Sequence, residues 1–214
     1  MSTVERKVKE KEERRNMILD AAEQHFSAAG YDQVTMDDVA QAAKLAKGTL
    51  YLYFRNKESL YVGVVTRGVA VLGDMIEQSM AGEKKGLSKA YAAGLAYYEF
   101  SKKYPVYFDM LIDAEGLCLS ETVGEAIRKE FSGEQAKAWQ ITVEAVRLGL
   151  ADGTIRPEAE PAKTALFLIE STRAMIKASL GAHLLLRRPV SRDEFVYFGL
   201  DMLKHAIENK GDHR

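Results

Sequence analysis

The sequence has only one cysteine and four prolines among its 214 residues, and each scarcity excludes something. Cys118 has no partner within the chain, so an intramolecular disulfide is excluded and a cytosolic setting fits. No run approaches the roughly 18 uninterrupted apolar residues of a membrane span, and the charged N-terminus lacks the apolar segment of a secretory signal. We therefore expect a cytoplasmic protein that does not cross a membrane.

All four prolines lie at or beyond position 105. The first 104 residues thus contain no proline break, as expected for consecutive helices. No run alternates polar and apolar residues as a half-buried strand does. Apolar residues make up 47% of the chain, which is enough for a hydrophobic core. We predict an all-α fold of about nine helices.

Motifs that carry catalysis or bind metals are missing as well. None of the four histidines, His25, His183, His205 and His213, lies at a metal-ligand spacing. Cys118 lies in no nucleophile motif, and no glycine-rich loop for a phosphate is visible. We therefore expect neither an enzyme nor a bound metal or cofactor. Because the net charge is −1, any nucleic-acid surface must be local.

The most informative stretch runs over residues 34–60. Thr35 followed by Asp38 is a helix N-cap signal with a carboxylate near the positive end of the helix. Apolar residues then recur at helical spacing, so residues 35–43 are predicted to form a short amphipathic helix. A tight turn follows, and residues 47–54 are predicted to form a second short helix.

The second of these helices has two different faces when its residues are placed about 100° apart. Leu50 and Phe54 fall together and are expected to face the core. The opposite side and the flanks carry residues that a free surface does not favour, namely Gly48, Thr49, Tyr51, Leu52 and Tyr53. Four basic side chains and no acidic one occur over residues 44–57. These features together favour a surface that meets a DNA groove.

In its order of residues, this stretch resembles the DNA-binding signature of TetR-family transcriptional repressors. The resemblance covers about residues 15–60 and rests on Thr35, Asp38, Val39, Ala40, Lys47, Gly48, Thr49, Leu50, Tyr51, Leu52, Tyr53, Phe54, Lys57, Glu58 and Leu60. One departure is Ala46, because the family often has Ser or Thr there as the cap of the recognition helix. The resemblance implies a helix-turn-helix DNA-binding domain with a charged N-terminal tail over residues 1–58. A ligand-binding and dimerisation domain would cover residues 59–214.

The DNA contacts follow from this resemblance and from side-chain chemistry. A tyrosine hydroxyl reaches phosphate, threonine and leucine methyls suit thymine, and glycine lets the backbone approach. Lys57, in the first turn of the next helix, is expected to grip a phosphate, with a simple surface lysine as the alternative. The predicted DNA-binding residues are Thr35, Lys47, Gly48, Thr49, Tyr51, Leu52, Tyr53 and Lys57.

The other helices are predicted from periodicity, caps and breaks. Gly30 is expected to end the first helix, and Pro161 suits a first helical turn. Thr122 with Glu125 has the spacing of a capping box, as does Ser191 with Glu194. Residues 115–120 are expected to form a loop. The predicted helices cover residues 14–30, 57–80, 87–104, 105–114, 122–151, 161–186 and 191–209.

The last two predicted helices are too apolar for one chain to bury. The simplest solution is a homodimer that packs these helices against their copies about a two-fold axis. TetR-like proteins dimerise in this way, so the resemblance implies the same arrangement. Two recognition helices about 34–36 Å apart would then read a palindromic operator. The predicted dimer-interface residues are Phe167, Met175, Phe195, Phe198 and Met202.

The helices between these two regions are expected to enclose a ligand pocket for an apolar or amphipathic effector. An aromatic stripe at helical spacing also suits plain core, and that alternative stays open. A buried Glu170 would need a partner, which is either the effector or Arg173 at the dimer seam. The predicted pocket residues are Tyr91, Tyr98, Tyr104, Phe108, Met110, Trp139 and Glu170.

The sequence therefore predicts a ligand-responsive transcriptional repressor that binds double-stranded DNA as a dimer and is released by a small molecule. The response to ligand is what the resemblance implies. The alternative is an all-helical module for small-molecule binding or assembly that does not bind DNA. That alternative leaves the run from Lys47 to Tyr51 unexplained.

Overall fold

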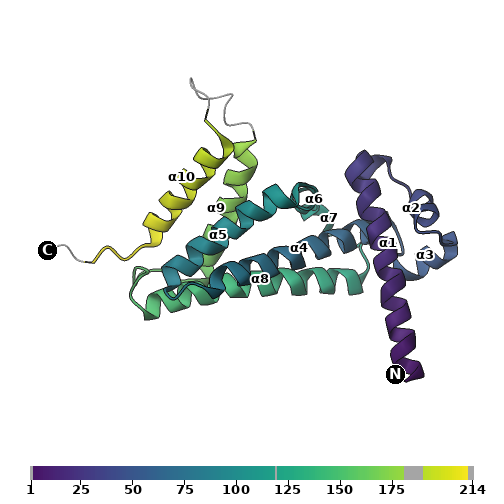
Figure 1. Cartoon of the computed structure of the whole chain (residues 1–214), viewed down its shortest axis with the longest axis horizontal. Coiled ribbons are helices and arrows are strands. Elements are labelled where there is room, and N and C mark those ends of the chain that lie inside the picture. Colours follow the sequence, from purple (N-terminus) through teal and green to yellow (C-terminus); the bar gives the residue numbers. More distant parts are fainter. Residues whose placement is uncertain (1, 119, 181–189, 212–214) are drawn as a thin grey trace. The chain divides into compact units, whose positions relative to one another are not determined.

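The computed structural model describes residues 2–118, 120–180 and 190–211, and every regular element in these ranges is a helix (Figure 1). The predicted all-α fold is thereby confirmed. An isolated bridge between Ile155 and Glu208 is the β-type pairing found there. The helices are α1 (Thr3–Gln33), α2 (Met36–Ala42), α3 (Lys47–Tyr53), α4 (Lys57–Ala81), α5 (Gly86–Lys103), α6 (Pro105–Asp113), α7 (Glu115–Cys118), α8 (Glu125–Ala151), α9 (Pro161–Ser179) and α10 (Arg192–Ile207).

The chain forms two compact units. The first unit comprises Met1–Gly68 and Val106–Gly133, and the second comprises Val69–Pro105 and Glu134–Arg214. Two helices, α4 and α8, are continuous and contribute residues to both units. The first unit thus holds α1, α2 and α3 together with α6, α7 and the first turns of α8.

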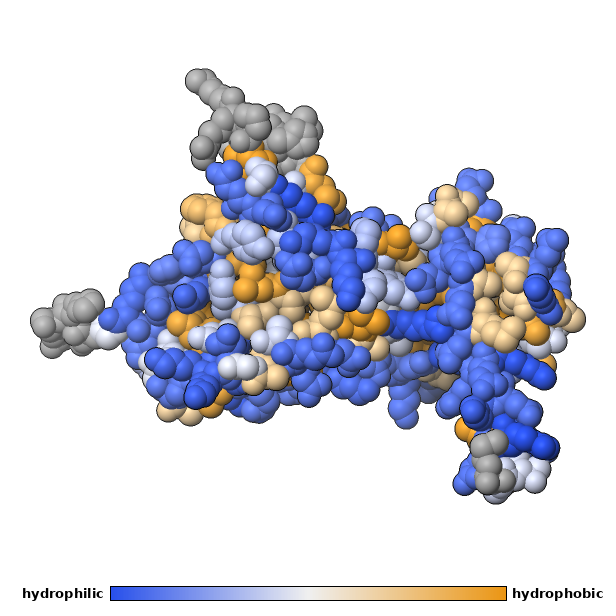
Figure 2. Space-filling view, in the orientation of Figure 1, coloured by the Kyte–Doolittle hydropathy of each residue, from blue (hydrophilic) through white to orange (hydrophobic). Residues whose placement is uncertain are grey.

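The core of the first unit begins on one face of α1. Ile18, Leu19, Ala22 and Phe26 are buried there, which is the i, i+3, i+4 pattern of an amphipathic helix. Gly30 has a φ of 77°, a left-handed value that favours glycine, so the regular helix is interrupted at the residue predicted to end it. The N-terminal half of α1 is exposed, and Figure 2 shows mostly hydrophilic residues along it.

Helix α4 is long and apolar enough to cross a membrane by composition alone. However, 67% of its most apolar 18-residue window is buried inside the protein, as expected of the core helix of a globular protein. Asn56 caps this helix as predicted, because its Oδ1 accepts from the Ser59 amide at 2.9 Å. The apolar character of α4 is therefore used for packing.

In the second unit, α5, α9 and α10 pack on one another. Small residues permit the close approach of helices, as at Gly86, where an added Cβ would lie 1.9 Å from the backbone nitrogen of Gly149. Gly94 likewise faces Leu200 of α10. Ser191 caps α10 as predicted, accepting from the Glu194 amide at 3.0 Å.

Three predicted boundaries were wrong. The first helix begins at Thr3, behind a capping box of Ser2 with Glu5, so the predicted charged tail before residue 14 is helical. The predicted loop over residues 115–120 contains the short helix α7. The Thr122 hydroxyl does not cap α8, because it lies 2.8 Å from the Ser120 hydroxyl, and the helix begins at Glu125 instead. The carbonyl of Gly124 accepts from the Arg128 amide at 3.0 Å. The predicted continuation of α9 to Leu186 lies outside the described residues beyond Leu180.

Candidate nucleic-acid interface

The predicted helix-turn-helix is present as α2 and α3. The Thr35 hydroxyl accepts from the Asp38 amide at 3.2 Å, and the Asp38 carboxylate accepts from the Thr35 amide at 2.9 Å. These two bonds form a capping box at the start of α2. The hydrogen bond from the Thr35 hydroxyl is also the main reason that the pKa of Asp38 lies below its ordinary value. Leu50 and Phe54 are buried, which confirms their predicted place in the core.

The outer face of α3 is exposed as the helical wheel predicted. Leu52 is 83% exposed and Tyr51 is 42% exposed, whereas Thr49 and Tyr53 are half-buried at the flanks. An added Cβ on Gly48 would meet no atom within 4 Å, so the backbone there lies open. Ala46 provides no side-chain cap, as its identity indicated. A leucine this exposed on a seven-residue helix is available to a partner.

Three of the four cations of residues 44–57 already have partners within the first unit. The Lys47 ammonium lies 2.6 Å from the Asp37 carboxylate, and the hydrogen bond to Asp37 raises the pKa of Lys47. Arg55 donates to backbone carbonyls of the segment before α8. Among the described residues, no hydrogen bond or ion pair holds the Lys44 ammonium. The basic surface is therefore smaller than its sequence indicates.

Lys57 is held at the end of α1. Its ammonium donates to the carbonyls of Tyr31 at 3.0 Å and Asp32 at 3.4 Å, and it lies 4.4 Å from the centre of the Tyr31 ring. A cation at this position satisfies carbonyls of the last turn of α1 and interacts favourably with the helix dipole. Lys57 is half-buried, and an ammonium has a third donor, so the predicted phosphate contact stays a prediction.

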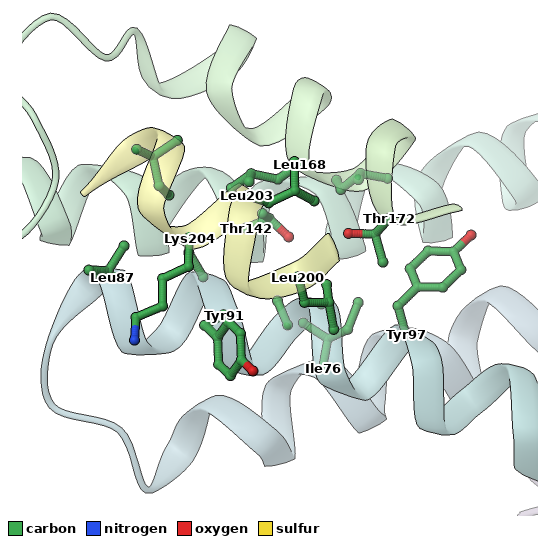
Figure 3. Close-up of a pocket in the computed structure, with 15 residues that line it drawn as sticks. Ile76, Leu87, Tyr91, Tyr97, Thr142, Leu168, Thr172, Leu200, Leu203 and Lys204 are labelled. Atoms are coloured by element: carbon green, nitrogen blue, oxygen red, sulfur yellow. The ribbon is translucent and has the colours of Figure 1, made fainter. Parts of the chain in front are cut away.

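A cavity of about 30 Å³ lies among α4, α5, α8, α9 and α10 in the second unit (Figure 3). Most of its lining is apolar, and the polar residues are Tyr91, Tyr97, Thr142, Thr172 and Lys204. The Lys204 ammonium lies 5.5 Å from the centre of the Tyr91 ring. Typical small-molecule pockets enclose about 300–1,000 Å³, so a ligand must open this cavity to enter it.

The residues predicted for the pocket are dispersed. Tyr91 lines the cavity, but the buried Tyr98 donates its hydroxyl to Asp193 instead. The acceptor Asp193 and burial both raise the pKa of Tyr98, with burial the larger cause. Glu170 is exposed and paired with Arg173, which was the alternative the sequence left open.

The other predicted pocket residues lie away from this cavity. The Tyr104 ring packs at 5.7 Å from that of Phe100, and Trp139 is half-buried outside the lining. Phe108 and Met110 are buried in the first unit. Sequence reasoning missed Tyr97, Thr142, Thr172 and Lys204. Thr142 and Thr172 could have been found, because each is a threonine within a mostly apolar helical face.

The residues predicted for the dimer interface lie on α9 and α10. Phe198 is 65% exposed, Met202 59% and Phe167 51%, and Leu166 beside them is 54% exposed. Phe195 and Met175 are half-buried, with the Met175 sulfur directly against Gly199. The outer face of α9 and α10 is thus apolar and uncovered in a single chain. We call it the α9/α10 face.

No group of three His, Cys, Asp or Glu side chains is placed to hold a metal ion within the described ranges.

Comparison with known families matches residues 18–64 to the model of bacterial regulatory proteins of the tetR family. The chain is 26% identical over 167 residues to an uncharacterized HTH-type transcriptional regulator, YhgD of Bacillus subtilis, covering 77% of this chain and 83% of that protein. It is 40% identical over 47 residues to the negative regulator of the biofilm operon icaADBC, IcaR of Staphylococcus aureus. That match covers 22% of this chain and 25% of IcaR.

Among solved structures, the chain is similar to the transcriptional regulator FadR from Bacillus subtilis in complex with stearoyl-CoA. The TM-score is 0.66 at 16% identity, covering 89% of this chain and 98% of that one. At this identity the likeness speaks for the fold. The matched family segment contains the second half of α1, all of α2 and α3 and the first turns of α4, and its α3 carries the exposed face with Leu52.

Proposed function

This chain is a TetR-family transcriptional regulator of the ligand-responsive repressor class, and we propose that two copies of it bind one palindromic operator and leave it when an amphipathic effector binds the second unit. The observation that carries the DNA-binding role is the exposed outer face of α3, with Leu52 83% exposed beside the open backbone of Gly48. The predicted family and class are confirmed. The dimer, the operator and the effector belong to the proposal.

Chemistry supports placing α3 in the major groove. Leu52 offers methyl groups that suit contact with the methyl group of thymine, and the Tyr51 hydroxyl can donate to or accept from bases and phosphates. The Lys44 ammonium has no partner within the described ranges and would neutralise a phosphate. Lys47 would either leave Asp37 for a phosphate or use its remaining N–H donors. The surface would therefore combine base contact with local positive charge.

The α9/α10 face supports the dimer. Four large apolar side chains there are each more than half exposed, and contiguous apolar patches on single chains mark interaction sites. A two-fold axis through this face would use the same patch on both copies. Such a particle presents two recognition helices, which are expected to read half-sites one helical turn apart.

The cavity of the second unit supports an amphipathic, acidic effector. Its apolar lining suits a hydrocarbon body, and Lys204 is the cation that would pair with a carboxylate or phosphate. FadR from Bacillus subtilis, which shares the fold, has been solved with stearoyl-CoA. We propose a long-chain acyl thioester as the class to try first. Since the cavity holds only about 30 Å³, binding must shift helices, which is how a ligand would favour one state over another.

Selection of bound duplexes from a random pool, followed by mobility shift at modest salt, tests the DNA-binding role. We expect an inverted repeat whose half-site centres are about 10 base pairs apart. Long-chain acyl-CoA should then release the selected duplex, and Lys204→Ala should raise the concentration needed. An unenriched pool would exclude the repressor, and enrichment without release would exclude only the effector. We expect the protein to act in the cytoplasm, where DNA and acyl thioesters meet.

A further inference from the structure

Arg55 is an exposed cation beside the recognition helix whose guanidinium is bonded to the backbone of the segment before α8. It lies between the end of α3 at Tyr53 and the start of α4 at Lys57. Its Nε donates to the Thr122 carbonyl at 3.0 Å, and its Nη2 donates to the Glu121 carbonyl at 2.8 Å and also to that of Thr122. The guanidinium fork thus grips two successive backbone carbonyls, a geometry that a lysine ammonium does not reproduce.

Two neighbours of Arg55 hold the same segment. The Asn56 side-chain amide donates to the Thr122 carbonyl at 2.8 Å. The Gly124 amide donates to the hydroxyl of the buried Ser59 at 3.0 Å. Backbone groups of residues 121–124 are therefore bonded to three side chains around the corner where α3 ends and α4 begins.

The segment so held leads directly into α8. Val123 is completely buried, and α8 begins at Glu125. One turn later, Glu130 pairs with Arg15 of α1 at 2.6 Å, and the Arg15 guanidinium also lies over the Phe54 ring at 5.5 Å. The first turns of α8 are thus fastened to both sides of the helix-turn-helix within the first unit.

We propose that Arg55 is a positioning residue for operator binding. By its grip on the Glu121 and Thr122 carbonyls it fixes the end of α3 to the start of α8, and this fastening, rather than a phosphate contact, is its contribution. The proposal rests on the proposed function, because it concerns how α3 is presented to DNA. A hydrogen bond from a charged donor is stronger than one between neutral groups, and Arg55 makes several of them.

The fastening would let an effector act on the recognition helix through α4 and through α8. Helix α4 starts at this corner and contributes Ile76 to the cavity of the second unit. Helix α8 starts three residues after Thr122 and contributes Thr142 to the same cavity. Each is one uninterrupted helix that begins beside the residues that hold Arg55, so a shift of either helix at the cavity would act on the segment that holds the end of α3.

Three variants test the role of Arg55. Arg55→Ala removes both the guanidinium hydrogen bonds and the positive charge, whereas Arg55→Lys keeps only the charge. Lys44→Asn is the control, because it removes a positive charge that is bonded to none of the described residues. Asparagine is chosen because Lys44 has a φ of 55°, a conformation that asparagine tolerates. The readouts are the operator Kd as a function of salt and amide hydrogen exchange of residues 120–128 in the free protein.

We expect Arg55→Ala and Arg55→Lys both to weaken operator binding about tenfold, the effect of losing about 1.4 kcal/mol. Both should leave the slope of log K against log salt at the wild-type value and speed exchange at residues 120–128. Lys44→Asn should keep wild-type exchange and lower the slope by at most about 0.9. An Arg55→Ala slope lowered by about 0.9 and restored by Arg55→Lys would overturn the proposal, because that is a phosphate contact.

Unchanged affinity and exchange in Arg55→Ala would overturn it as well. The exchange measurement needs no DNA, so it judges the fastening even if the wild-type protein bound no duplex. In that event faster exchange in Arg55→Ala would confirm the fastening, and only the DNA-binding role would fail.

Discussion

Two exposed surfaces, the outer face of α3 and the α9/α10 face, both present large apolar side chains to solvent, yet they differ in size and in charge. The face of α3 lies on a seven-residue helix, and its exposed leucine and tyrosine follow the cations Lys44 and Lys47 in the sequence. The α9/α10 face spans helices of 19 and 16 residues and carries Leu166, Phe167, Phe198 and Met202.

The difference teaches what each surface binds. A small apolar group among cations suits a polyanion whose grooves carry methyl groups and hydrogen-bonding edges. A broad apolar face suits burial against an equal face, because the stabilisation is proportional to the apolar area that is buried. Substitutions on the face of α3 should therefore leave the dimer intact. Operator binding, in contrast, should need both surfaces.

The largest effect is expected from a charge in the centre of the α9/α10 face. Phe198→Asp should convert the dimer to monomers, because a carboxylate cannot be buried there without a partner. Operator affinity should fall at least 100-fold, since one half-site contact is lost. Sedimentation velocity and mobility shift measure the two quantities. Val8→Asp, a charge on an apolar residue of α1 that is 53% exposed, is the control and should remain dimeric. If the Phe198→Asp protein stayed dimeric, the α9/α10 face would not be the dimer interface.

A smaller effect, confined to DNA, is expected from the face of α3. Tyr51→Ala should weaken operator binding about 10- to 100-fold and leave the dimer intact, because contacts to bases and phosphates are each worth about 1–3 kcal/mol. Tyr197→Ala on α10 is the matched control, since Tyr197 is 41% exposed and Tyr51 42%. It should keep the wild-type operator Kd at concentrations where the dimer persists. Equal losses in both variants would show that the two surfaces are not distinct.

Lys57→Ala tests whether Lys57 binds a phosphate or only caps the end of α1. The substitution should weaken binding to operator and to unrelated DNA alike and lower the salt slope by about 0.9, if the third donor of the ammonium meets a phosphate. It should also lower the Tm by a few degrees, because the Tyr31 and Asp32 carbonyls lose their cation. A changed base preference would contradict the phosphate role, and an unchanged slope with a lower Tm would leave Lys57 as the cap of α1.

The smallest effect is expected at the start of α3, which has no side-chain cap. Ala46→Ser should place a hydroxyl where it accepts from a first-turn amide and stabilise the protein by roughly 1 kcal/mol. The Tm should rise while the dimer is unaffected. Thermal unfolding by circular dichroism measures this, and Ala46→Gly serves as the comparison without a hydroxyl. An unchanged Tm would mean that the backbone of α3 is already satisfied in another way.

The elements and faces of the helix-turn-helix could be predicted because their causes are local. The Thr35 and Asp38 cap, the periodic apolar residues and the burial of Leu50 and Phe54 all depend on residues within one or two turns. The exposure of Phe167, Phe198 and Met202 followed from excess apolar residues on two helices.

Side-chain partners that lie far along the chain could not be predicted. Lys57 meets carbonyls 26 and 25 residues away, and Arg55 meets carbonyls 66 and 67 residues away. Every residue has a backbone carbonyl, so the sequence does not show which carbonyl a side chain will meet. Lys57 and Arg55 were therefore counted as cations available to DNA. Tyr98 was predicted for the pocket while Tyr97 lines it, because one residue turns a helix by about 100° and the phase is set by α9 and α10.

Photo-crosslinking with an operator whose thymines are replaced by 5-bromouracil tests the central claim most directly. The bromine takes the place of the methyl group in the major groove, so a crosslink identifies the protein residues beside it. The account predicts crosslinked peptides that contain residues 47–53, with Tyr51 as the attached side chain. Crosslinks within residues 161–207, or none in a complex that still binds the substituted duplex, would contradict it.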